Sequence, residues 1–307
     1  MLNIKETQST NIVRIAGLLK ELDIEEKKDH EGREFITAKA TIKVDQEVNG
    51  KMEENEIVVS SFAYKLTKDG KVSKLYTNPE YKSGILEWKD VYRSLATCPE
   101  DQPELASRVL ITAGDISENM WADPNSGEMR TTFQINTKFM NLQKKPVDDE
   151  ASFELSGVVL GKAWEVDKQG ENTGRLKVQF GVIGFNGRLN VITLIAATEA
   201  SANYIDSNWN DYDTVTVAGK VSINQSTEVW YEEQGFGEPI KRTKTVSRKE
   251  LIILGGSPGG LDEELSYDAG DIDKAAEERQ ARAAEKKEKA KTNQRAQAPK
   301  NSNKFGF

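Results

Sequence analysis

The chain has 307 residues, with 42 Lys or Arg against 50 Asp or Glu, and at roughly 100–200 residues per domain it allows two domains. The formal net charge of -8 argues against a general nucleic-acid-binding surface but allows a local basic groove, because electrostatic steering depends on the local field. One cysteine, Cys98, and one histidine, His30, exclude an internal disulfide and nearly exclude a zinc site or a His-dependent catalytic pair.

The N-terminal residues 1–11 are polar and lack the apolar core of a signal peptide. No stretch of the chain approaches the ~20 apolar residues that a membrane-spanning helix needs. We therefore expect a soluble protein of the cytoplasm.

A weak internal repeat runs through the chain. Residues 15–19 (Ile-Ala-Gly-Leu-Leu) match residues 155–159 (Leu-Ser-Gly-Val-Val), and the pair Gly32-Arg33 matches Gly174-Arg175. Residues 113–117 (Ala-Gly-Asp-Ile-Ser) match residues 218–222 (Ala-Gly-Lys-Val-Ser). The matches keep the same order, so the sequence predicts a duplicated unit of about 100 residues or slightly more.

The first unit begins with a strand that has Gly17 at its centre, followed by a polar hairpin and an alternating strand over residues 35–44. A long insertion over about residues 65–105 follows the third strand. Within it, apolar residues at three- and four-residue spacing predict a helix over residues 85–95, with Trp88 in the core. The predicted inward set of the alternating strand is Ile36, Ala38, Ala40, Ile42 and Val44; the outward set includes Phe35, Lys39 and Lys43.

The second unit repeats this order, with Gly157 in its first strand, Phe180 as a core residue and a weaker helical signal over residues 198–209. Five short strands with a helix between the third and fourth is the order of an OB barrel, and a glycine in the first strand suits a barrel corner. We predict a mainly β protein with two tandem OB-type five-stranded barrels, over residues 1–148 and 149–256.

Residues 257–307 are predicted to form a flexible charged tail, disordered or helical, with an apolar tip. The tail follows a glycine-rich breaker at residues 255–260. Residues 274–291 are rich in Ala, Glu, Lys and Arg and contain i,i+4 pairs such as Glu278–Arg282. Because this stretch lacks an apolar stripe, we expect it to bury no face against the barrels.

The strand with a central glycine, the Gly-Arg hairpin, the alternating strands, the helix and the run from Asp213 to Val221 together resemble the OB-fold single-stranded DNA-binding proteins. The layout of folded core, polar linker and apolar tip is similar to that family as well, and the duplicated barrel resembles a phage-encoded version, which would act in the host cytoplasm. The resemblance implies that the tip recruits replication or repair partners. The usual bacterial tip is acidic, whereas this one carries Lys304 and no acid.

Binding a single strand requires cations for the phosphates and flat faces for base stacking, and OB barrels present both on strands two and three and in the adjoining loops. In the first unit we expect these contacts from Arg33, Phe35, Lys39, Lys43, Tyr64, Lys65, Trp121 and Arg130, with Phe62 as the alternative to Tyr64. In the second unit we expect them from Arg175, Lys177, Phe185, Arg188, Trp230, Tyr231, Lys241, Arg242 and Lys244. Phe305 and Phe307 are expected to bind protein partners. The hairpin tryptophans Trp121 and Trp230 either stack on bases or fold back and seal the barrels.

The sequence contains no Gly-x4-Gly-Lys-Ser/Thr phosphate loop and no GxGxxG fingerprint after a strand. No Asp/Glu cluster stands out from the acidic background, so we predict no enzyme activity, no cofactor and no metal. The leading hypothesis is a single-stranded DNA-binding protein that coats exposed strands during replication, recombination or repair. The alternative is a structural or adaptor protein, such as a phage assembly component, that uses its barrels for protein contacts.

Overall fold

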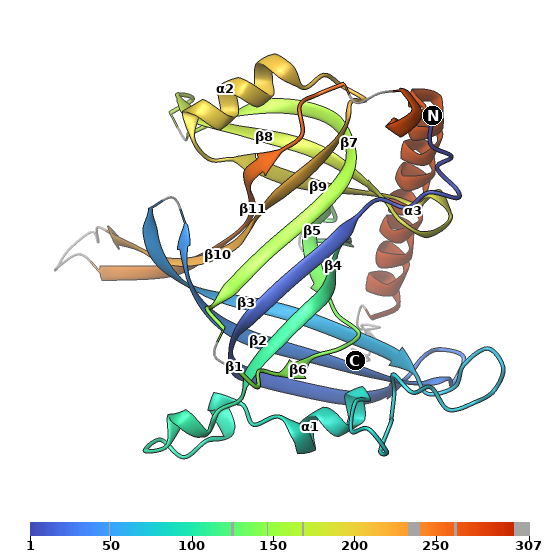
Figure 1. Ribbon diagram of the computed structural model, residues 1–307, viewed down its shortest axis with the longest axis vertical. Coiled ribbons are helices and arrows are strands. Elements are labelled where there is room, and N and C mark those ends of the chain that lie inside the picture. The colour runs from blue at the N-terminus through green and yellow to red at the C-terminus, as the bar shows by residue number, and fades with distance from the viewer. Residues whose placement is uncertain are drawn as a thin grey trace, which may run out of the picture.

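The computed structural model describes residues 1–48, 50–123, 126–145, 147–167, 169–232, 240–260 and 263–297 (Figure 1). Within these residues eleven strands form one continuous sheet that closes into a barrel twice. The mainly β fold predicted from the alternating pattern is confirmed.

The first barrel is built from five strands in the order of an OB barrel. β1 pairs with β2 and β2 with β3 in the antiparallel sense, and β3 then pairs with β5 in parallel. β5 pairs with β4, and β4 returns to β1, which closes the barrel. The bounds are β1 Asn11–Lys28, β2 Glu34–Val48, β3 Lys51–Tyr64, β4 Arg108–Ala122 and β5 Met129–Asn136, with the short β6, Asn141–Leu142, against β4.

The second barrel repeats these pairings strand for strand. β7 pairs with β8, β8 with β9, β9 in parallel with β11, β11 with β10, and β10 with β7. The bounds are β7 Glu150–Val166, β8 Asn172–Ile183, β9 Leu189–Ala196, β10 Thr214–Glu232 and β11 Ile240–Gly256. The duplication inferred from the sequence is thus a duplication of a complete five-stranded barrel.

A helical segment lies between the third and fourth strands of each barrel, as predicted. In the first barrel it is shorter than the expected 85–95, because the chain becomes extended at Tyr92, whose hydroxyl donates to the backbone carbonyl of Met140. Trp88 is buried there, as predicted. The segments are η1 Ile85–Glu87, α1 Trp88–Val91, η2 Leu95–Thr97 and η3 Pro103–Leu105 in the first barrel, η4 Phe185–Gly187 between β8 and β9, and α2 Glu199–Asn208 in the second barrel.

The barrel cores follow the period-two pattern of the strands. Ile36, Ala38, Ala40, Ile42 and Val44 are all buried, as is Phe180 of the second barrel. The glycine in each first strand allows a close approach of two strands. A Cβ on Gly17 would lie 2.3 Å from the Lys43 carbonyl oxygen, and one on Gly157 would lie 2.2 Å from that of Gly181. Both glycines are therefore required at these corners, as predicted.

The first strands of the two barrels pair with each other. Residues 11–16 of β1 run antiparallel to residues 150–155 of β7, with Val13 opposite Phe153 (Figure 1). Val13 and Phe153 are repeat equivalents, because Gly17 and Gly157 occupy the same position in the two units. A pairing centred on a residue and its own equivalent has the geometry of a two-fold axis, so the barrels face each other as the halves of a symmetric dimer would.

The buried amide side chains of Gln46 and Asn55 join the two barrels at a second place. Gln46 of β2 donates through Nε2 to the carbonyl oxygen of Val221 at 2.7 Å and accepts through Oε1 from the N–H of Ala151 at 3.1 Å. Asn55 of β3 accepts through Oδ1 from the N–H of Ile223 at 2.7 Å. At this point β10 has left β7, so the amides satisfy backbone groups that have lost their neighbouring strand.

The C-terminal helix docks on the barrels, so the expectation that this stretch buries no face is wrong. The helix α3 (Ala269–Gln297) follows the turn η5 (Glu263–Leu265). Ile272 and Ala275 of α3 are buried with Tyr267 and Ile4 in a second, smaller core. The apolar contact covers only the start of α3, which is why no stripe is visible along the whole helix.

The strands of the first unit end at β6 and those of the second end at β11. The boundaries 1–148, 149–256 and 257–307 as separate domains stay a prediction. No helix within the described residues is both long and apolar enough to cross a membrane. Over the same residues no group of three or more His, Cys, Asp or Glu side chains is placed to hold a metal ion.

We predict that Gln46→Ala weakens the junction between the barrels. The change leaves the Val221 carbonyl and the Ala151 N–H buried without their partner, at a cost of about 1–3 kcal/mol in the free energy of unfolding. Urea unfolding followed by tryptophan fluorescence measures the loss, with the exposed Gln169→Ala as the matched control. Equal stability of the two variants would show that the Gln46 amide does not hold the junction.

Candidate nucleic-acid interface

Three aromatic rings form an exposed cluster on the first barrel. Phe35 of β2 lies opposite Tyr64 of β3, and Phe62 is two residues away on the same face of β3. The ring centroids are 5.3 Å apart for Phe35 and Phe62, 5.0 Å for Phe62 and Tyr64, and 6.2 Å for Phe35 and Tyr64. Phe62 is 48% exposed and Tyr64 37% exposed. Their neighbours Ile36 and Ala63 point into the core, so alternation forces the rings outward.

The predicted cation Arg33 lies on this cluster, which we call the aromatic platform (Phe35, Phe62 and Tyr64). Its guanidinium carbon is 4.9 Å from the centroid of the Tyr64 ring, within the range of a cation–π contact. Asp29 fixes the guanidinium, because Nε of Arg33 donates to Oδ2 of Asp29 at 2.7 Å. Burial acts to raise the pKa of Asp29, but the hydrogen bonds from Arg33 and from the N–H of Glu31 outweigh it and lower this pKa below its ordinary value.

A groove of about 570 Å³ adjoins the aromatic platform on the outer face of the barrel. We call it groove 1. Phe62 lines it together with the amide side chains of Gln134 and Asn136 on β5. Its charged residues are the lysines Lys39 and Lys138 and the carboxylates Asp23, Glu25 and Asp115. Lys39 is exposed, as the alternation predicted. The Gln134 amide donates to Oδ1 of Asn136, and the Asn136 amide donates to Asp115 and Ser117, so both belong to a polar network on β4 and β5. Neither amide was predicted from the sequence, where Arg130 was the only candidate on β5.

Three more predicted cations of the first barrel are held in surface ion pairs. Lys43 lies 2.7 Å from Glu54, Lys65 lies 2.5 Å from Glu34, and Arg130 lies 3.1 Å from Asp123. These pairs raise the pKa of Lys43 and of Lys65. Exposed ion pairs are typically worth about 0–1 kcal/mol, so a phosphate can replace the carboxylate at little cost.

Trp121 lies near the end of β4, opposite Arg130 of β5. It is 40% exposed, so its indole is neither sealed into the core nor fully free. The side chain therefore keeps one accessible face at the hairpin where the sequence placed it.

In the second barrel the predicted cations Arg175 and Lys177 belong to one ion-pair network. Arg175 lies 3.3 Å from Glu165 and 2.6 Å from Glu250, and Lys177 lies 3.2 Å from Glu165. Arg248 joins both carboxylates, at 2.8 Å from Glu165 and 2.6 Å from Glu250. Three cations thus share two carboxylates, and the network carries one excess positive charge.

This network opens onto a second groove of about 520 Å³, which we call groove 2. Its floor includes Gln179 of β8 and Thr193 of β9, and Lys177 and Arg248 face it from the second barrel. Residues 131–133 of β5 in the first barrel form the opposite wall, and Arg279 of α3 completes it. The sequence analysis missed Arg248 and Arg279, although Arg248 stands in the same basic run as the predicted Arg242.

The remaining predicted residues either do not line groove 2 or have side chains that lie outside the described residues. Phe185 is 73% exposed in the turn between β8 and β9, and it and Arg188 are not among the residues that line groove 2. Arg242 is exposed on β11. Trp230 and Tyr231 stand on β10 and Lys241 and Lys244 on β11, but their side chains lie outside the described residues, as do Phe305 and Phe307 entirely.

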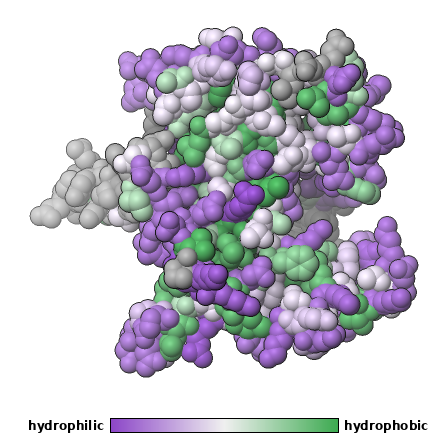
Figure 2. All heavy atoms as spheres, in the orientation of Figure 1, coloured by the Kyte–Doolittle hydropathy of each residue, from purple (hydrophilic) through white to green (hydrophobic). Residues whose placement is uncertain are grey.

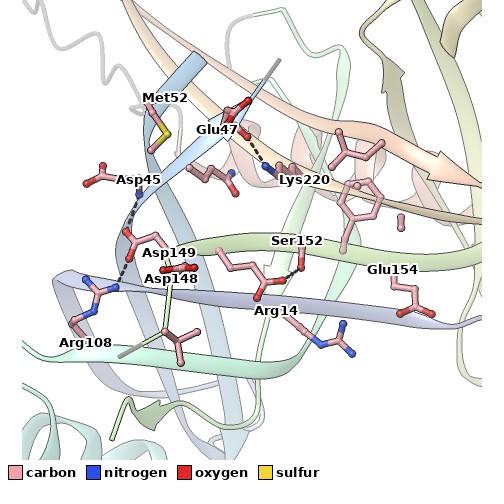
Figure 3. A pocket seen from close by; sticks show the side chains of 17 residues that line it. Arg14, Asp45, Glu47, Met52, Arg108, Asp148, Asp149, Ser152, Glu154 and Lys220 are labelled. Carbon is pink, nitrogen blue, oxygen red and sulfur yellow. Dashed lines mark hydrogen bonds and ion pairs between the residues drawn. The ribbon is translucent and has the colours of Figure 1, made fainter. Parts of the chain in front are cut away.

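A further hollow, of about 760 Å³, lies where the barrels meet and is acidic (Figure 3). Lys220 points toward Glu47 there, and Arg108 is paired with Asp149. On the face of the molecule that Figure 2 shows, hydrophilic residues dominate the outer edge and hydrophobic patches lie nearer the centre. The carboxylates of the hollow are Asp45, Glu47, Asp148, Asp149, Glu150 and Glu154, against the cations Arg14, Arg108 and Lys220. Six carboxylates against three cations repel phosphates more strongly than the three carboxylates and two lysines of groove 1, so this hollow is not part of the candidate interface.

The family model of YorF matches residues 9–290. No curated protein matches the sequence. Among solved structures, a deletion mutant of the single-stranded DNA binding protein from Thermus aquaticus has a TM-score of 0.49 and 13% identity, covering 83% of this chain and 97% of that chain. The wild-type protein of the same organism has a TM-score of 0.48 and 13% identity, covering 86% of this chain and 98% of that chain.

We predict that Glu165→Gln destabilises the protein at neutral pH and much less at acid pH. Burial acts to raise the pKa of Glu165, but the hydrogen bond from Lys177 and the charges of Arg175 and Arg248 lower it overall. A carboxylate with a lowered pKa stabilises the fold fully above its ordinary pKa, and this contribution is lost as the pH falls through the lowered value.

Urea unfolding of the wild type and of Glu165→Gln, each at neutral and at acid pH, checks this prediction. The control is Glu171→Gln, which removes an exposed carboxylate. A stability difference that stays the same at both pH values would contradict an ionic role for Glu165.

Proposed function

The chain belongs to the YorF family, and we propose that it is a single-stranded DNA-binding protein without enzyme activity. In this proposal it coats and protects exposed strands during replication, recombination or repair. The observation that carries it is the aromatic platform with Arg33 on Tyr64, at the edge of a groove on the outer face of an OB-type barrel.

The aromatic platform supports a single strand over a duplex. Bases in a duplex are stacked on each other, whereas an unpaired base can stack on a side chain and contribute about 1–3 kcal/mol. Every base has such a face, so stacking favours binding without sequence specificity. Lys39 and the loosely paired Lys43 and Lys65 stand on or beside the same two strands, where they can contact phosphates.

The two grooves support a path that uses both barrels. β5 borders both, since Gln134 and Asn136 line groove 1 and residues 131–133 line groove 2. A strand on the aromatic platform can therefore continue along β5 to Lys177 and Arg248 of the second barrel. Linking two weak sites raises the overall affinity, because the second contact becomes intramolecular.

The proposal is tested by titrating a fluorescent oligo-dT of about 30 nucleotides, a length that covers two barrels at up to roughly 16 nucleotides each. We expect tight binding at low salt that weakens by about 0.7 log units per log of salt for each phosphate contact. A duplex of the same length is the control and should bind far more weakly.

If the single strand does not bind at low salt, the proposal is wrong and the barrels serve as a scaffold for protein contacts. Equal binding of strand and duplex would contradict stacking as the main contribution and indicate a charge-only surface.

A further inference from the structure

Helix α3 runs alongside both barrels (Figure 1), and its Arg279 lines groove 2. Its first turns pack on the second barrel, where Ile272 is buried against Leu189 and its neighbours. Further along, Arg279 reaches the first barrel and donates through Nε to both carboxylate oxygens of Glu118 on β4, at 2.8 and 3.0 Å. The Glu118 side chain is 3% exposed, so this is a buried ion pair that fixes the helix.

Further hydrogen bonds hold α3 at the same junction. Arg282 donates to the carbonyl oxygen of Leu189 in the second barrel, and Lys286 donates to that of Met120 in the first, both at 3.3 Å. Met120 directly precedes Trp121 and lies opposite Thr131, which lines groove 2. The helix therefore runs from the small second core, past groove 2, to the hairpin that carries the half-exposed Trp121.

The charges along α3 change sign between its two halves. Residues 269–285 contain five acidic residues and three basic ones, whereas residues 286–297 contain one acidic residue and five basic ones. Lys286, the first residue of the positive half, donates to the Met120 carbonyl oxygen of the first barrel, beyond the contact that Arg279 makes with Glu118. Lys286 and Lys289 are exposed and Lys287 is half-buried, and Lys289 lies 2.6 Å from Glu285. Arg279, two turns earlier on the same helix, lines groove 2.

We propose that the second half of α3 is part of the strand-binding surface and that Lys286, Lys287 and Lys289 bind phosphates of a strand that passes between groove 2 and Trp121. This inference rests on the proposed function and deepens it. The helix lies next to two surfaces that suit a strand, the cationic wall of groove 2 and the exposed indole of Trp121. Its charge is opposite to that of the strand, and its position is fixed by the Arg279–Glu118 pair.

The proposal changes the role of the C-terminal region. The resemblance implied a tail whose tip recruits partners, whereas in this proposal the second half of α3, residues 286–297, binds the strand itself. Removal of the whole segment after residue 260 would also remove Tyr267 and Ile272 from the second core, so truncation is a poor test. Substitution of exposed lysines separates binding from folding.

The experiment compares oligo-dT binding by the wild type and by Lys286→Gln/Lys287→Gln/Lys289→Gln at several salt concentrations. We expect affinity at low salt to fall roughly ten-fold and the slope of log affinity against log salt to decrease by about 2, the value for three lost phosphate contacts. The matched control Lys82→Gln/Lys89→Gln/Lys274→Gln removes three exposed lysines that do not line groove 1 or groove 2 and should bind like the wild type.

Two further variants keep the test decisive. Lys287→Gln/Lys289→Gln leaves the Lys286–Met120 hydrogen bond in place and should still lose affinity while far-ultraviolet circular dichroism shows unchanged helix content. Replacing all three lysines by Arg should restore binding.

Unchanged affinity and slope in the triple Gln variant, with a wild type that binds, would overturn the role of α3 alone. A wild type that does not bind the oligonucleotide would overturn the proposed function and this inference with it.

Discussion

The antiparallel pairing of β1 with β7 is the constraint on which the candidate interface depends. Because it is centred on Val13 and its repeat equivalent Phe153, it places two similar barrels in one fixed relation. The same two-fold relation applies to the other places where the barrels meet. In the strand registers Asn190 is the equivalent of Asn55, and Glu118 is the equivalent of Ile223. The junction at Asn55 and Ile223 therefore corresponds to the one at Asn190 and Glu118. Amide side chains hold one of these junctions, and α3 covers the other with the Arg279–Glu118 pair. Groove 2 has a wall from each barrel and one from α3 only because this arrangement is fixed.

The electrostatics explain how an acidic chain can suit a polyanion. The hollow between the barrels has six carboxylates against three cations, and groove 1 has three against two. At groove 2 the balance is reversed, because four cations face two carboxylates. The pairs of Lys43 and Lys65 are surface pairs worth about 0–1 kcal/mol. The carboxylates that pair with the cations of groove 2 are largely buried, with Glu165 13% and Glu250 12% exposed. Stacking on a ring contributes about 1–3 kcal/mol per base, so in the proposed function we expect the aromatic platform to supply most of the affinity and the cations mainly to orient the backbone.

The buried faces of the strands and the barrel corners could be predicted, because they depend only on residues that are close in the sequence. Alternation gave the buried set from Ile36 to Val44 and the outward Phe35 and Lys39, and the corner glycines gave the barrel bends. The sequence could not show that Glu165 and Glu250 neutralise Arg175, because strands far apart in the chain bring them together. It also could not show that α3 docks, since a short apolar patch and one buried ion pair replace an apolar stripe. Stacking by Trp230 and partner binding by Phe305 and Phe307 stay predictions.

The central claim is that flat rings on β2 and β3 of the first barrel hold the bases. The most direct test is the affinity for oligo-dT of Phe62→Leu, which keeps an apolar side chain but removes the flat face, beside Phe62→Tyr, which keeps the face. Tyr81→Leu, at an exposed ring of the insertion, is the control. The account predicts a loss of about 1–3 kcal/mol for Phe62→Leu only, roughly a five- to hundred-fold weaker affinity. Wild-type affinity for Phe62→Leu would contradict it and show that the aromatic platform does not bind bases.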